Sequence, residues 1–205
     1  MYNGISYGMF GDCRISNIPA NLLDTCKYLT NIEGLFANPY GFEQNISFTT
    51  ANSGTPYIPI KFLENQRSLK NCKNLFLGTS VNFDQPTPQE LNSFFPNTLI
   101  NASGCFSKTN VGGDVYNYLL QYKTNLTDAS AMFQETPITG TPSQDIFIGC
   151  DALQNLASFF EGCKNLGQLS ITTASPDDLA FKHIFDNTPE LRNVNKMFKN
   201  CIRFG

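Results

Sequence analysis

Seven cysteines are the residues of this chain with the most versatile chemistry, because thiolates can pair as disulfides or bind a metal. Their spacing favours neither use, since the count is odd and no two of them form a Cys-x-x-Cys motif. Cys13, Cys163 and Cys201 share one position of an internal repeat with threonine and proline. A metal ligand does not exchange so freely, whereas a small packing residue does. We therefore predict reduced structural thiols, with no metal and no cofactor.

The other residues capable of catalysis do not form a recognisable set. His183 is the only histidine, so every mechanism that needs two histidines is excluded. Glu90, Asp177 and Asp178 stand at expected helix starts, where the helix dipole stabilises a carboxylate. The stretch "VGGD" at 111–114 lacks the Gly-Lys-Ser/Thr of a phosphate-binding loop, which favours a turn. The sequence therefore predicts a protein that is not an enzyme.

An internal repeat supplies the elements that carry these residues. Six segments align without gaps over the ten residues that follow a leucine, with Asn or Asp two positions after the leucine and Phe seven positions after it. Apolar residues at the third, sixth and seventh positions give the stripe of a short amphipathic helix, which the Asn or Asp would cap. The six leucines are Leu29, Leu69, Leu99, Leu126, Leu153 and Leu191.

A second apolar pattern before each leucine predicts another short helix, and β-prone pieces such as "RISNIP" separate the units. In one unit "TPQE" (Thr87 to Glu90) offers a capping box for that helix. We therefore predict an α/β fold, a curved leucine-rich-repeat-like solenoid of about six to seven units, each a short strand plus two short helices. Residues 1–205 would form a single repeat domain, either a fragment of a longer repeat protein or a domain capped by partners.

Composition limits the partners that this chain can have. The net charge is −3 and 15% of the residues are charged, so we expect no binding to nucleic acid. No stretch approaches the roughly 20 apolar residues of a membrane span, so we expect no membrane insertion. The first residues, "MYNGISYGMFGD", lack the basic region and the apolar core of a secretory signal peptide.

Two stretches, "IPANLLDTCKYLTNIEGLFAN" and "LQNLASFFEGCKNL", resemble BspA-like leucine-rich repeats in their Phe-x-x-Cys pattern and Asn-rich turns. The resemblance extends over residues 5–201, although some units are longer and Thr or Pro replaces several cysteines. It implies repeats of the type found in bacterial surface and adhesion proteins and in phage virion proteins.

The resemblance leaves two functions open. The first is a non-catalytic protein-interaction or adhesion module of a surface-exposed protein, with a protein or a glycan as its partner. The alternative is a structural virion protein, such as part of a phage tail or fibre, whose repeats serve assembly. The expected location is therefore extracellular, at the cell surface, or in a virion.

The candidate partner-binding residues lie in the longest insertion between repeat segments, residues 40–57. Four aromatic residues of this insertion are not required by the repeat, namely Tyr40, Phe42, Phe48 and Tyr57. They would form a contact patch for a protein or glycan, or they would extend a strand and cover the neighbouring part of the core. A second insertion spans residues 164–178.

Overall fold

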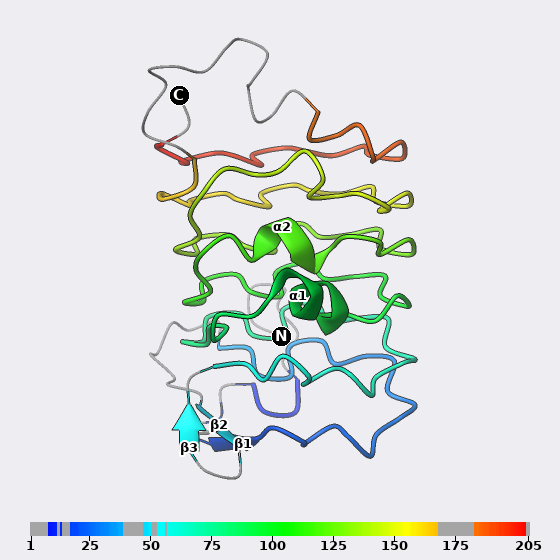
Figure 1. Cartoon of the computed structure of the whole chain (residues 1–205), viewed down its shortest axis with the longest axis vertical. Helices are drawn as coiled ribbons and strands as arrows, with labels where there is room; N and C mark the ends of the chain where they lie inside the picture. Colours follow the sequence, from blue (N-terminus) through cyan, green and yellow to red (C-terminus); the bar gives the residue numbers. More distant parts are fainter. Residues whose placement is uncertain are drawn as a thin grey trace.

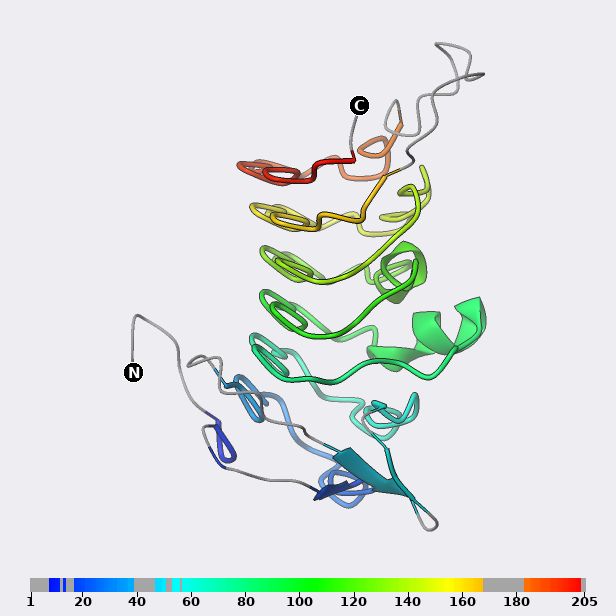
Figure 2. The same ribbon diagram turned by 90° about the vertical axis from the view of Figure 1, so that its left-hand side faces the viewer.

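The computed structural model of the chain describes residues 8–11, 13, 17–38, 47–50, 53–55, 57–167 and 183–203. Figure 1 shows these residues stacked in levels along the long axis, and Figure 2 shows the same stack from the side. Each repeat segment lies in one level, which we call a layer. Layers 1 to 6 begin at Leu29, Leu69, Leu99, Leu126, Leu153 and Leu191, and positions are counted from these leucines.

The predicted α/β fold class is wrong. The described residues contain two short helices, α1 (Pro88–Phe94) and α2 (Tyr116–Leu119), where two were expected in every unit. They contain three short strands, β1 (Asn17–Pro19), β2 (Ser47–Thr50) and β3 (Ser53–Thr55), in one sheet of order β1-β2-β3. Units of a strand and two helices, as in a leucine-rich-repeat-like solenoid, do not occur in this part of the chain.

The backbone at the fifth position explains why the expected helices are absent. This residue has a positive φ in all six layers, whereas a right-handed helix needs a negative φ. The amide of the sixth residue donates to the carbonyl of the third, which closes a tight turn around the fifth. The six residues, with φ between 53° and 62°, are Gly34, Asn74, Gly104, Ala131, Ser158 and Lys196.

Backbone amides alternate between two kinds of acceptor. In layer 3 the amides of Gly104, Phe106 and Lys108 donate to carbonyls of layer 4, at 2.8 to 3.0 Å. The amides between them, at Cys105 and Ser107, donate within their own layer. The other pairs of adjacent layers follow the same pattern. The apolar spacing that predicted helices therefore arises from consecutive turns that are bonded to the next layer.

The Asn or Asp at the second position caps a turn and not a helix. Its Oδ1 accepts the amide two residues further on, at 2.8 to 3.1 Å, in every layer. The same residues form the parallel backbone bridges that join successive layers. These bridges link Asn31 to Asn71, Asn71 to Asn101, Asn101 to Asp128, Asp128 to Asn155, and Asn155 to Asn193.

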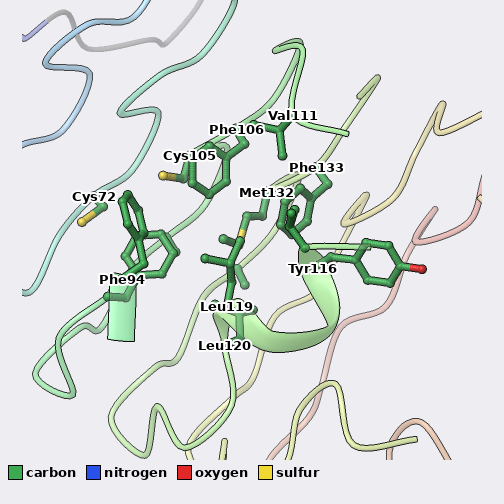
Figure 3. Close-up of a cluster of buried hydrophobic side chains, with 14 of the residues drawn as sticks. Cys72, Phe94, Cys105, Phe106, Val111, Tyr116, Leu119, Leu120, Met132 and Phe133 are labelled. Atoms are coloured by element: carbon green, nitrogen blue, oxygen red, sulfur yellow. The ribbon is translucent and has the colours of Figure 1, made fainter. Parts of the chain in front are cut away.

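A column of stacked phenylalanine rings runs through the core. Adjacent rings lie 5.6 to 6.3 Å apart between centroids and are 6° to 24° from parallel. Figure 3 shows two of them, Phe106 and Phe133, packed near Tyr116 of α2. Each fully buried ring contributes roughly 1.5–3 kcal/mol through its burial. The column consists of Phe10, Phe36, Phe76, Phe106, Phe133, Phe160 and Phe198.

The two helices lie outside this column and precede layers 3 and 4. The capping box predicted for "TPQE" is confirmed at the start of α1, where Thr87 and Glu90 bond each other's backbone amides. Buried side chains of α1 and α2, including Phe94 and Leu119, close the core on this side. In the described part of the chain, no helix has the length and apolarity needed to cross a membrane.

Candidate functional site

The aromatic residues proposed from the sequence are only partly described by the structure. Tyr40 and Phe42 lie outside the described residues. Phe48 lies in β2, where its backbone pairs with Ile18 of β1 and with Thr55 of β3. Tyr57 follows β3, forms a parallel bridge to Asn82, and exposes 38% of its surface. The structure therefore does not test whether the four residues form one patch, and that site stays a prediction.

Five of the seven cysteines lie in the core, as expected of packing residues. The thiols of Cys150, Cys163 and Cys201 each donate to a backbone carbonyl of the preceding level, at 2.9 to 3.0 Å. Burial raises the pKa of Cys150 to about 11 and that of Cys201 to about 12, so these thiols stay protonated at neutral pH. Cys13 and Cys26 differ from the expectation because they are exposed.

His183 does not form part of a catalytic arrangement among the described residues. Its Nδ1 lies 2.7 Å from Oδ2 of Asp186, one turn along the chain, and both side chains are exposed. No interaction of His183 with a serine or cysteine is found there. Grouped histidine, cysteine and carboxylate side chains that could hold a metal ion are also absent from the described part of the chain.

The acidic residues and the glycine turn have structural roles where they are described. Hydrogen bonds from the backbone and side chain of Thr87 lower the pKa of Glu90, which caps α1. Asp177 and Asp178 lie outside the described residues, as does most of the insertion 164–178. In the stretch 111–114, Gly113 has a φ of +70° and forms a parallel bridge to Ile138.

A groove along one edge of the stack is lined mainly by polar side chains. It has a volume of about 730 Å³ and crosses layers 3 to 6. The ninth residue of each of these layers lines it and has a positive φ, between 55° and 79°. We call this the edge groove, and the four residues are Lys108, Glu135, Gly162 and Asn200.

Charges of both signs face the edge groove. Lys108 Nζ lies 3.6 Å from Glu135 Oε1, and both side chains are more than half exposed. Glu161 accepts a hydrogen bond of 2.9 Å from Lys199, which lowers the pKa of its carboxyl group. Lys164 also lines the groove, and it has no ion-pair partner among the described residues. These groups can bind a polar ligand, but they include no nucleophile paired with a base.

The edge groove was missed by the sequence reasoning, although a signal for it was present. The ninth position holds glycine in layers 2 and 5, at Gly78 and Gly162, and Lys, Glu or Asn in the other four layers. Glycine at a fixed repeat position indicates a left-handed backbone, which turns the chain sharply. That turn would have placed the ninth residues on one edge of the stack.

Comparison with known proteins gives no relative from which a function could be transferred. The chain matches no protein-family model, no curated protein and no solved structure. The resemblance to BspA-like repeats therefore stays a prediction, and the function has to be argued from the chain itself.

Proposed function

We propose that the protein is a non-catalytic binding module of a surface-exposed protein, and that the edge groove holds its protein or glycan partner. The observation that carries this proposal is Lys164, a cation that lines the groove without an ion-pair partner among the described residues. A charged donor of this kind contributes about 1.5–3 kcal/mol when it meets an acceptor on a ligand.

The form of the edge groove supports a large partner more than a small metabolite. It is an open trough that crosses four layers, whereas a pocket for a small molecule encloses most of its ligand. Its lining combines cations and carboxylates with Thr109 and Asn110, so hydrogen bonds and ion pairs would provide the recognition. Peptide segments and sugar chains both offer groups of this kind along their length.

The test is a binding screen of the chain against arrayed glycans and a displayed peptide library. Lys164→Ala and Glu135→Gly should each weaken the binding of any ligand found by at least about tenfold, which is roughly 1.4 kcal/mol. Glycine suits position 135 because the backbone there has a φ of +55°, so this change removes the side chain without strain.

Lys196→Gly is the matched control. Lys196 also has a left-handed backbone, with a φ of +59°, and it does not line the edge groove. Its replacement should leave binding unchanged. Equal loss in all three variants, or no loss in Lys164→Ala and Glu135→Gly, would contradict a partner site in the groove.

A second candidate function is a structural component of a virion, such as a phage tail or fibre protein whose layers serve assembly. It is favoured by layer 6, where the amides of Val194, Lys196 and Asn200 have no acceptor among the described residues. The corresponding amides of layers 2 to 5 all donate to the next layer. Layer 6 therefore has bonding capacity for a further chain segment.

A further inference from the structure

The stack has two chemically different ends. Between adjacent layers, amides at the third, fifth, seventh and ninth positions donate towards the C-terminal layer. The carbonyls that accept them belong to the second, fourth, sixth and eighth positions of that layer. Each layer thus has a donor edge on one side and an acceptor edge on the other.

Layer 6 presents its donor edge without a following layer among the described residues. Its third residue, Val194, exposes 42% of its surface. The third residues of layers 3 to 5, Ala102, Ala129 and Leu156, are fully buried because the next layer covers them. Ile202, just beyond layer 6, is 74% exposed. Apolar groups and free amides are therefore combined on this surface, which we call the tail face.

Residues 8–11 present the matching acceptor edge at the other end. Phe10 occupies the seventh position of a partial layer, because its ring stacks on Phe36 and its amide donates to Leu35 of layer 1. The carbonyls of Met9 and Gly11 then take the sixth and eighth positions, and neither has a donor among the described residues. We call this surface the head face.

The exposure of Met9 indicates that no layer of the described residues covers the head face. Met9 exposes 79% of its surface, whereas the sixth residues of layers 2 to 4 are fully buried. Figure 2 shows residues 8–11 and layer 6 at opposite ends of the stack of turns. Phe10 and Phe198 are the first and last described rings of the phenylalanine column, and they lie in the partial layer and in layer 6.

We propose that copies of this chain associate head to tail, with the tail face of one copy on the head face of the next. In the register that joins all the layers, the amide of Asn200 meets the carbonyl of Gly11, and Val194 becomes covered. A second copy is the occupant that both faces fit, because donors and acceptors occur in the same register at the two ends. The contact is heterologous, so it continues into a linear assembly and does not stop at a dimer.

This inference deepens the assembly candidate and does not depend on the edge groove. The test is sedimentation velocity of the chain at roughly 1–100 μM, a range in which a contact of micromolar affinity becomes populated. The mean mass should rise with concentration above the monomer mass of 22.8 kDa, without a limit at the dimer. A wild-type chain that stays monomeric throughout would overturn the proposal.

Two variants test the direction of the contact. Val194→Glu places a charge on the tail face and Met9→Glu places one on the head face, at positions exposed enough to fold normally. Each variant alone should be monomeric, and a 1:1 mixture should form dimers and nothing larger, since one intact junction remains. Tyr122→Glu, at a side position that is 55% exposed, should associate like the wild type.

Each other outcome contradicts head-to-tail association. If Met9→Glu alone forms dimers, two tail faces pair with each other. If the mixture stays monomeric although the wild type associates, the contact lies elsewhere on the molecule. Glycan or peptide binding by these variants is measured separately, so loss of the groove function and loss of association are distinguishable.

Discussion

Lys123 is the residue whose burial is least expected from its chemistry, because it is 1% exposed. Its Nζ donates to the carbonyls of Asn92 and Gln121, at 2.7 and 3.2 Å. No carboxylate forms an ion pair with it in the described part of the chain. The corresponding residues Gln66 and Cys150 also donate to carbonyls of the preceding level. Three of the six equivalent positions therefore supply a donor to the preceding level, and before layer 4 that donor is a lysine.

Burial lowers the pKa of Lys123 from 10.5 to about 8, which makes stability depend on pH. Between these values the unfolded chain binds more protons than the folded chain, so the contribution of Lys123 to stability rises with pH. We expect wild type to gain up to roughly 3 kcal/mol relative to Lys123→Met between pH 8 and 10.5. Urea unfolding of both proteins across this range measures the difference. Parallel pH curves would show that the amine is not desolvated.

At the scale of the elements, the sequence identified the repeat and most of its buried positions. Phe36, Phe76 and Phe133 were placed in the core by the repeat register, and each is at most 1% exposed. The backbone that carries them was wrongly predicted, because apolar residues at the third, sixth and seventh positions suit a helix and a series of turns equally. Only the sign of φ at the fifth and ninth positions separates the two. Ala131 and Glu135 adopt a positive φ, which alanine and glutamate seldom do, so the sequence does not indicate it.

The glycines at the ninth position indicated a sharp turn, but they did not by themselves reveal the edge groove. Its lining includes the ninth residues of four successive layers, each of which has a positive φ. Tight turns, repeated in register, place Lys108 and Glu135 in neighbouring layers on one edge. The groove thus depends on how layers stack, which is a long-range property that local patterns do not contain.

The phenylalanine column should dominate the stability of each layer. Phe133 is fully buried and stacks between Phe106 and Phe160, so Phe133→Ala should lower the free energy of unfolding by roughly 3–5 kcal/mol. Gln134→Ala should cost less than about 1 kcal/mol, since its partly buried amide makes long hydrogen bonds to Ser107 and Glu161. Urea denaturation compares the two. Similar losses would mean that the column is not the main source of stability.

At the scale of the whole molecule, the reactivity of the cysteines shows whether the stack unfolds all at once or layer by layer. Cys13 and Cys26 are exposed, and the other five thiols are buried. At pH 8 we expect two thiols to react quickly with iodoacetamide and five to react only when the chain unfolds, because buried thiols are protonated and covered. Mass spectrometry of the alkylated protein counts them. Rapid labelling of more than two thiols would show that layers open individually in the native state.

More backbone amides point towards the following layer than towards the preceding one, which gives the molecule a net dipole along the stack. Layer 3 sends four amides towards layer 4, from Ala102 to Lys108, and receives two in return, from Thr127 and Asp128. Peptide dipoles therefore do not cancel along the stack, as they largely do in an ordinary sheet. Their positive end lies at the tail face and their negative end at the head face. Molecules placed in line would attract one another through this polarity before any side chains touch.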